Sequence, residues 1–361
     1  MDGLGRQLHG TDNQVRRRDM LVGLPIFASS LLAFDHAQSV GATTRERFAG
    51  KPKLGTAVRK EDVADQAIAR IIADNFSIVS PERDLKMSVT WPNRSKYDFS
   101  GFDTIYRFAQ RTGLRVRGHT LIWHNSVPGW SRAAVSVSRP QMYRLIEGYA
   151  GALGRYAFCS WDVVNEALAD ASGKGDLRDS FWLRSLGENY IAEIFAIARS
   201  IHPSTPLIYN DYGLEFGGFK QQAALRLLRR LVDKGVPISG LGLQSHLFAR
   251  DNPAFPSLWR FVENVTALGI GIYITELDIS SKYVADHRND EDIDLATERT
   301  LNAYLSCFAG ARIREITTWG VTDRHSWLNP QGHLRQRPLP FDANGRPKRM
   351  WTAIENLAVD R

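Results

Sequence analysis

The segment Trp161-Asp162-Val163-Val164-Asn165-Glu166 has the pattern of a short buried strand that ends in polar residues. Its middle is apolar and β-branched, which favours a strand. Seven more segments are short, apolar and bounded by loop signals in the same way. Together they give eight predicted strands: Leu54–Val58, Phe76–Val79, Leu114–His119, Trp161–Val164, Leu207–Tyr209, Gly240–Gln244, Ile270–Thr275 and Ile316–Trp319.

Apolar stripes with helical spacing lie between these strands. One continues across residues 63–72, a second across residues 105–109 and a third across residues 224–232, with Gly113 and Gly235 as stop signals after the second and third. Strands that alternate with helices imply a parallel sheet. Eight such units fit a closed (β/α)8 TIM barrel better than an open sheet, and no glycine-rich phosphate loop follows the first strand.

Composition restricts the class of protein only loosely. The chain has 361 residues and a net charge of +7, with basic residues spread along its length. This charge is compatible with an ordinary basic surface or with an acidic partner such as nucleic acid or an acidic polysaccharide, but no nucleic-acid module is visible. The two cysteines, Cys159 and Cys307, exclude a disulfide framework and leave a single bridge open.

The first 42 residues differ from the rest. A basic cluster at Arg16-Arg17-Arg18 precedes an apolar run from Leu21 to Phe34, and small residues follow it. This layout is typical of an export signal, and the Arg-Arg pair resembles the twin-arginine type. We therefore predict a leader over residues 1–42, a catalytic barrel over residues 43–361 as the only further domain, and a secreted or periplasmic location.

Polar residues end nearly every predicted strand. In a barrel of this kind, the C-terminal ends of the strands form one rim that carries the active site. The sequence therefore predicts a concave site rich in carboxylate, imidazole, amide and indole groups, built from Glu82, Lys86, His119, Trp123, Asn165, Glu166, Gln244, His246, Glu276, Trp319 and Trp327.

Two of these residues, Glu166 and Glu276, end the fourth and seventh predicted strands, which face each other across a barrel mouth. Cleavage of a glycosidic bond needs two such carboxyl groups: one protonates the leaving oxygen, and the other attacks the anomeric carbon or activates water. Asn165 can then bind a sugar hydroxyl, and His246 can keep Glu276 ionised. We see no metal-ligand spacing and no serine-hydrolase motif, so we expect no metal and no serine hydrolase.

The ordered strings around these residues resemble glycoside hydrolase family 10, the endo-1,4-β-xylanases. The resemblance covers residues 53–357 and rests on five strings: Arg117–His124, Trp161–Glu166, Gly240–His246, Ile274–Asp278 and Trp319–Asp323 with Ser326–Leu328. It implies a (β/α)8 fold, hydrolysis of internal bonds of xylan with retention, and no cofactor. It also implies Glu166 as acid/base, Glu276 as nucleophile, and sugar-binding roles for the other nine site residues.

Two positions depart from the family pattern. Arg83 stands where the family usually has Asn, and Asn125-Ser126 stands where it usually has Ser-Gln. The usual residues would contact the second sugar on the non-reducing side of the cut. Arg83 could accept an acidic branch such as a glucuronyl group, or it could turn away and weaken that subsite; the sequence leaves both open.

Two other functions remain compatible with the sequence. One is the same chemistry on another β-1,4-glucan or an aryl glycoside. The other is an inactive carbohydrate-binding barrel, against which the intact pair of Glu166 and Glu276 counts. We expect the partner to be xylan, with no nucleic acid, no membrane after removal of the leader, and a monomeric protein.

Overall fold

The computed structural model describes residues 52–133, 137–173, 175–284, 289–330 and 336–357. Nine strands occur in this part of the chain: β1 (Lys53–Val58), β2 (Ile78–Pro81), β3 (Arg115–Trp123), β4 (Phe158–Asn165), β5 (Leu207–Asp211), β6 (Gly240–Leu243), β7 (His246–Phe248), β8 (Gly271–Ser280) and β9 (Ile313–Thr318). All but β7 pair as a ring of parallel strands, which the pairing of β6 with β8 closes. The predicted (β/α)8 barrel is confirmed.

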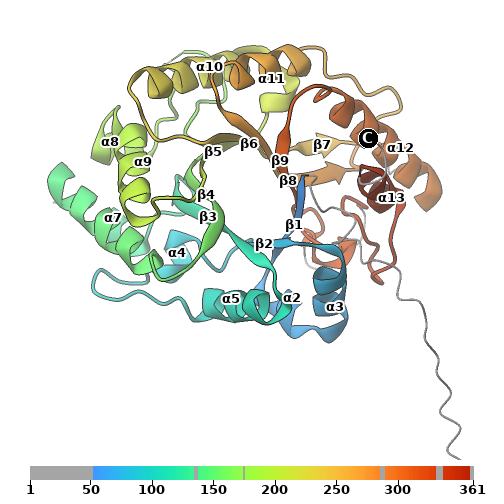
Figure 1. Ribbon diagram of the computed structural model, residues 1–361, viewed down its shortest axis with the longest axis horizontal. Helices are drawn as coiled ribbons and strands as arrows, with labels where there is room; N and C mark the ends of the chain where they lie inside the picture. Colours follow the sequence, from blue (N-terminus) through green and yellow to red (C-terminus); the bar gives the residue numbers. More distant parts are fainter. Residues whose placement is uncertain (1–51, 134–136, 174, 285–288, 331–335, 358–361) are drawn as a thin grey trace, which may run out of the picture. The chain divides into compact units, whose positions relative to one another are not determined.

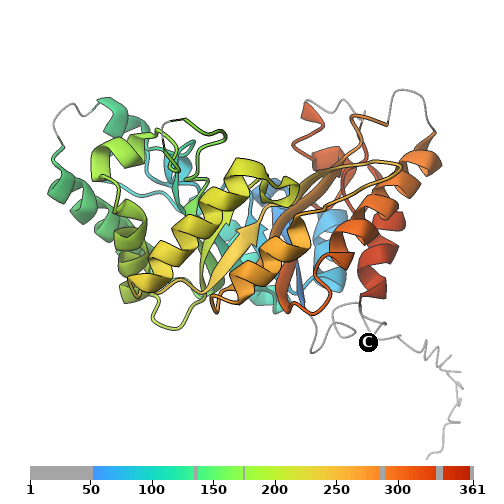
Figure 2. The same cartoon turned by 90° about the horizontal axis from the view of Figure 1, so that it is seen from above.

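Helices surround this ring on the outside (Figure 1). Their bounds are α2 (Lys60–Ala64), α3 (Gln66–Asn75), α4 (Met87–Thr90), α5 (Ser100–Thr112), α6 (Gly129–Ala133), α7 (Arg139–Leu153), α8 (Phe181–Leu186), α9 (Tyr190–Ile201), η1 (Leu214–Phe216), α10 (Gly218–Asp233), α11 (Leu258–Thr266), α12 (Asp290–Ser306), η3 (Asp323–His325) and α13 (Arg349–Asn356). In Figure 2, the yellow helix α10 and the orange helix α11 lie side by side on the barrel wall.

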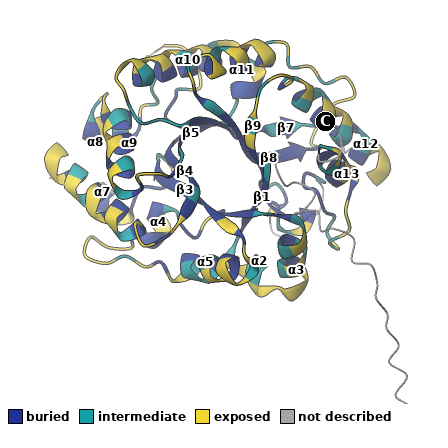
Figure 3. Ribbon diagram, in the orientation of Figure 1, coloured by how far each residue is buried: buried dark blue, intermediate teal, exposed yellow. Residues whose placement is uncertain are grey.

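Helices α5 and α10 bury the second and third apolar stripes that the sequence shows. In α10, Leu227, Leu228 and Leu231 are buried, whereas the outer face is exposed (Figure 3). Gly113 ends α5 in a left-handed conformation with φ 66°, which a residue without Cβ adopts most easily. The alternation of buried strands and half-buried helices therefore places the core between the ring and the helices.

The first predicted stripe is interrupted in the structure. Asp65 separates α2 from α3, and its carboxylate accepts hydrogen bonds from the backbone N–H groups of Ala67 and Ile68. Such N-capping begins a new helix, because it satisfies donors that have no partner in a helix's first turn. The single stripe over residues 63–72 thus belongs to two helices.

The ninth strand was not predicted. β7 continues the path of β6 and pairs with β8, with His246 opposite Asp278. Between β6 and β7, Ser245 takes φ 60°, and its N–H donates to Glu215 at 2.7 Å. This kink redirects the chain, and it brings His246 to the rim beside β8.

A buried charged network fills the interior of the barrel. The Arg117 side chain is 1% exposed; it pairs with Asp162 and lies 3.4 Å from Glu315. Ser160 donates to Glu315 at 2.9 Å, and the Asp162 carboxylate also accepts from His119 at 2.9 Å. The network links β3, β4 and β9 and ends at a residue of the predicted site.

The predicted leader, residues 1–42, lies outside the described residues. The helices of the described part are too short or too polar to cross a bilayer. Cys159, in β4, and Cys307, at the end of α12, are both free thiols.

Replacing Arg117 by Met should destabilise the fold strongly, because two carboxylates then remain buried without their cation. We expect a loss of about 3–5 kcal/mol in the free energy of unfolding, measured by urea denaturation. Arg115→Met, on the exposed face of the same strand, is the control and should change stability by less than about 0.5 kcal/mol. Equal unfolding curves for the two variants would contradict the structural role of the network.

Candidate active site

All eleven residues predicted for the site line one cleft of about 810 Å³ at the C-terminal ends of the strands. Trp123, Asn165 and Asn210 are in register on β3, β4 and β5, so their side chains reach the same level of the rim. Glu276 comes from β8, which is three strands from β4 in the ring, with β5 and β6 between them. Parallel pairing therefore brings together side chains that are far apart in the sequence.

Glu276 is buried and held by three neighbours. Asn210 donates an amide hydrogen bond to its Oε1 at 2.7 Å, and His246 Nε2 lies 3.3 Å from its Oε2. His119 Nδ1 is 3.9 Å from Oε1. The hydrogen bonds from Asn210 and His246 fix the carboxylate in one orientation toward the cleft.

The electrostatic surroundings favour the ionised form of Glu276. Burial alone would raise its pKa, but the hydrogen bond from His246 and the nearby charges of His119, His246 and Lys86 outweigh burial. The pKa of Glu276 therefore lies below the ordinary value for a glutamate. A deprotonated carboxylate is what a nucleophile requires.

His246 is the charged partner that makes this possible. Its Nδ1 lies 3.0 Å from Asp278, which also accepts from the indole N–H of Trp327 at 2.7 Å. Burial lowers the pKa of His246, but Asp278 and Glu276 raise it further, so the net pKa lies well above the ordinary value. A carboxylate against each ring nitrogen favours the protonated imidazole, which donates from both nitrogens.

Glu166 occupies a different environment. Its Oε2 accepts from the Trp123 indole at 2.7 Å, and its Oε1 accepts from Gln244 at 3.0 Å. Its backbone has φ 56°, a conformation unusual for a residue with a side chain, and its carbonyl accepts from Arg178 Nε at 3.1 Å. The two side chains that donate to its carboxylate, Trp123 and Gln244, are neutral, in contrast to the cationic donor at Glu276.

Asn165 and Asn210 connect the two glutamates. Asn210 Nδ2 donates to Asn165 Oδ1 at 2.8 Å as well as to Glu276, and Gln244 Nε2 donates to Asn165 Oδ1 at 3.2 Å as well as to Glu166. Gly242 leaves room for this arrangement, because a Cβ there would lie 2.2 Å from the Asn210 side-chain oxygen. The amide chain thus sets the spacing of the two carboxyl groups.

The other predicted residues form the walls of the cleft. Lys86 lies over the Trp123 ring at 4.4 Å, and Glu82 accepts two hydrogen bonds from Arg59 at 2.6 and 2.7 Å. Burial lowers the pKa of Lys86, although the neighbouring carboxylates oppose that effect. Trp319 packs edge-on against His119, and Trp327, 48% exposed, packs against His246. Flat indoles and charged donors therefore line the same cavity.

Several residues that the sequence did not single out also line the cleft: Arg178, Tyr212, Phe216 and Phe248, with His124 from a quoted string. Arg178 bonds Tyr212 at 2.7 Å and Asp170 at 2.9 Å. Burial and the Arg178 charge lower the pKa of His124 to about 4. Most of these residues lie in connections between the ring strands, where strand periodicity gives no signal, and Phe248 ends β7, which was not predicted. Only proximity to the Asn165-Glu166 and Gln244–His246 strings could have indicated them.

The two positions that depart from the family pattern, Arg83 and Asn125-Ser126, lie in different surroundings. Arg83 points to the surface, where it pairs with Glu61 at 3.2 Å and both side chains are about half exposed. Ser126 is buried, and its hydroxyl accepts from the Ser88 N–H at 3.0 Å, whereas Asn125 lines the cleft. In this arrangement Arg83 does not contribute to the cavity wall. This favours the alternative in which Arg83 turns away and weakens the subsite, over the alternative in which it accepts an acidic branch.

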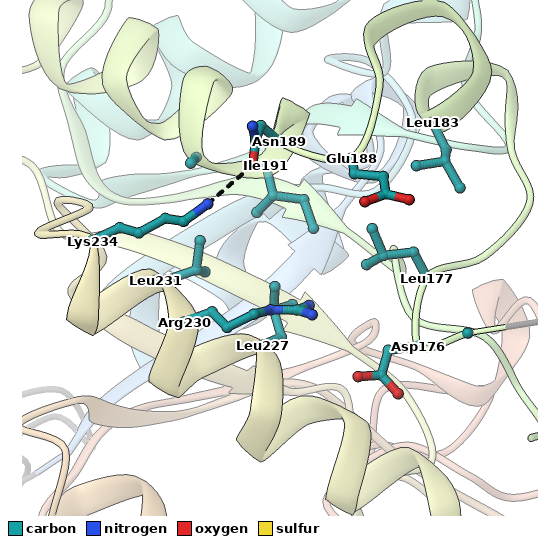
Figure 4. A pocket seen from close by; sticks show the side chains of 12 residues that line it. Asp176, Leu177, Leu183, Glu188, Asn189, Ile191, Leu227, Arg230, Leu231 and Lys234 are labelled. Atoms are coloured by element: carbon teal, nitrogen blue, oxygen red, sulfur yellow. Dashed lines mark hydrogen bonds between the residues drawn. The ribbon is translucent and has the colours of Figure 1, made fainter.

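A separate hollow of about 380 Å³ lies on the outside of the barrel, between α8, α9 and α10 (Figure 4). Its floor is aliphatic, and two of the charged groups at its edge have partners: Lys234 donates to Asn189 at 3.0 Å, and Asp176 pairs with Arg226 at 2.7 Å. It contains none of the predicted site residues. Within the described residues, no group of three or more His, Cys, Asp or Glu side chains could hold a metal ion.

Comparison with known proteins agrees with this architecture. Residues 43–357 match the model of glycosyl hydrolase family 10. The chain is 34% identical to endo-1,4-beta-xylanase A of Caldicellulosiruptor saccharolyticus, over 86% of this chain and 93% of that protein. It is 36% identical to a beta-1,4-xylanase of Dictyoglomus thermophilum, over 79% of this chain and 82% of that protein.

Solved structures give the same result. The crystal structure of an endo-1,4-beta-xylanase from Caldicellulosiruptor owensensis superposes with a TM-score of 0.78 at 32% identity, over 87% of this chain and 99% of that one. The crystal structure of a xylanase from Thermotoga petrophila in complex with xylobiose superposes with a TM-score of 0.80 at 27% identity, over 88% of this chain and 97% of that one. The chain belongs to glycosyl hydrolase family 10.

Proposed function

We propose that this chain is a retaining endo-1,4-β-xylanase in which Glu276 is the nucleophile and Glu166 is the acid/base. The observation that carries the proposal is the unequal environment of two carboxyl groups in one cleft. Glu276 is held by the cationic His246 and has a lowered pKa, whereas Glu166 is held by the neutral donors Trp123 and Gln244. Two carboxyl groups with different surroundings can take the two different roles that glycoside hydrolysis needs.

In the first step, a Glu276 oxygen forms a bond to the anomeric carbon while the bond from that carbon to the leaving oxygen breaks. Glu166 gives its proton to the leaving oxygen, so the shortened chain departs as an alcohol. His246 and Asn210 keep the Glu276 carboxylate aimed at the cleft, which reduces the reorganisation that the attack requires.

In the second step, Glu166 removes a proton from water, and the water oxygen displaces Glu276 from the anomeric carbon. Two displacements restore the original anomeric configuration. Asn165 lies between the glutamates and can donate to a sugar hydroxyl, a contact that strengthens as charge develops at the anomeric carbon.

The remaining wall residues would position the polysaccharide. Trp319 and Trp327 offer apolar ring faces, whereas Glu82, Lys86 and His119 offer charged or polar groups for hydroxyls. The named relatives act on xylan, and the same cleft chemistry could act on another β-1,4-glucan. Substrate choice is therefore the part of the proposal that an assay must decide.

Digestion of xylan should release short xylo-oligosaccharides from the start, because an open cleft lets the enzyme cut inside the chain. Mass spectrometry of products from xylan and from carboxymethyl cellulose measures this directly. We expect xylan to be cleaved at least about tenfold faster, since rejection of an extra substituent in a fitted site costs 1–3 kcal/mol. Faster release from carboxymethyl cellulose would contradict the xylanase assignment.

Removing the His246 cation should shift the pH profile. Glu276 must be deprotonated to attack, so the acid limb of kcat/KM follows its lowered pKa, and activity is lost as pH falls through that value. In His246→Gln the lowering contribution is lost, so the acid limb should move to higher pH. His325→Gln, a half-buried histidine that instead pairs with Asp62, is the control. An acid limb in His246→Gln at the wild-type pH would refute this role.

We further propose that residues 1–42 direct export, by the twin-arginine route or another, and that the mature barrel acts as a secreted or periplasmic monomer on xylan without a nucleic-acid partner. The basic cluster and the short apolar run at residues 16–34 motivate this. N-terminal sequencing of protein from the outside of the cell should begin near residue 43. An intact Met1 on the exported protein would overturn the leader.

A further inference from the structure

An aromatic surface extends the cleft away from the catalytic residues. Phe216 and Phe248 line the active-site cleft and also line a second hollow of about 550 Å³, which continues to Arg250 and Phe255. Because the two hollows share these two side chains, they adjoin. We call the second hollow, with the neighbouring Tyr283, the aromatic arm.

The arm lies across the barrel from the wall that carries Glu82 and Lys86. Those residues follow β2, whereas Phe216 is in η1 after β5, and Phe248 ends β7 after β6. In the closed ring, β2 and β6 are four strands apart, on opposite sides of the mouth. A polysaccharide that crosses the cleft from Lys86 past the two glutamates therefore reaches the arm.

The ring faces of the arm are available at the surface. Phe216 is 53% exposed and Tyr283 is 54% exposed, although both are large apolar side chains. Phe216 stacks on Phe255 at 6.3 Å, and Phe248 lies 5.2 Å from Tyr283, so the rings support one another. Exposed aromatic groups beside a catalytic cleft are typical of a surface that a ligand covers.

The arm also carries positive charge. The Arg250 guanidinium lies 4.4 Å from the Tyr283 ring, and the Lys282 ammonium lies 5.6 Å from the same ring. Arg250 lines the hollow, whereas the adjacent acidic residue, Asp251, does not. Stacking on Tyr283 orders the guanidinium without using its N–H donors, which can then bind a carboxylate in a forked geometry.

We propose that Arg250, which lines the aromatic arm, recognises a carboxylate on a side branch of the cleaved chain, as in a uronic acid. The inference rests on the proposed xylanase function. It places acidic-branch recognition at Arg250 instead of at Arg83, whose charge is paired with Glu61 at the surface. The whole chain has 46 basic and 39 acidic residues. This excess of positive charge also favours an acidic substrate.

The test compares two forms of one polymer. Glucuronoxylan is assayed beside the same xylan after its branch carboxyl groups have been reduced to alcohols, so only the charge differs. The enzymes are the wild type, Arg250→Gln, Arg250→Lys and the control Arg229→Gln, which removes an exposed arginine from α10. The quantity measured is the ratio of kcat/KM on the acidic polymer to kcat/KM on the reduced polymer.

We expect the wild-type ratio to be about three to ten, and to fall as salt is added, because the ion pair is exposed. Arg250→Gln should bring the ratio close to one, Arg250→Lys should retain part of it, and Arg229→Gln should keep the wild-type ratio. A wild-type ratio of one, or a ratio in Arg250→Gln equal to that of the wild type, overturns the role of Arg250. If the wild type cleaves neither polymer, the proposed function fails and this inference fails with it.

Discussion

His246 lies between two carboxylates, 3.3 Å from Glu276 and 3.0 Å from Asp278, and the chemistry depends on this group of three charges. A buried glutamate would otherwise take up a proton, because burial penalises the charged form. The imidazolium offsets that penalty at Glu276, and Asp278 in turn keeps the imidazole protonated. Glu166, by contrast, is held by indole and amide donors that do not carry charge. The two carboxyl groups of one cleft therefore have different surroundings, a cation at Glu276 and neutral donors at Glu166.

A buried polar network in the barrel interior connects the charges of the active site to the strands of the ring. Arg117 satisfies Asp162, and Asp162 holds His119, which faces Glu276. A chain of polar contacts thus runs from the interior of the ring to the nucleophile. A fully satisfied buried network of this kind restricts side-chain orientation, and an incomplete one is costly. The charges that shape the site are for this reason also part of what holds the strands together.

The sequence predicts the barrel well where its signals are local. Each of the eight ring strands is a short apolar run, and nearly every one delivers a polar residue to one rim, so Glu166 and Glu276 could be placed in one mouth without coordinates. β7 could not be predicted, because Ser245 kinks the chain through a left-handed conformation that is unusual for serine. The division of one apolar stripe into α2 and α3 depended on the capping role of Asp65.

The loop residues of the cleft were the hardest to foresee. Arg178 and Phe216 belong to connections whose path is set by tertiary contacts, such as the bond from Arg178 to the Glu166 carbonyl. The direction of Arg83 was likewise undecidable from its type, because its partner Glu61 lies in a different element. Periodicity identifies strands and helices, but it does not say where a long side chain between them will find its partner.

The central claim is that Glu276 bonds covalently to the sugar while Glu166 handles the proton. A 2-fluoro xylobioside with a good leaving group tests it most directly, since the fluorine slows release of the glycosyl-enzyme enough for peptide mapping by mass spectrometry. The account predicts one added xylobiosyl group, located on the peptide residue Glu276. A label on any other side chain, or turnover of ordinary xylan by Glu276→Ala at a rate near that of the wild type, would contradict it.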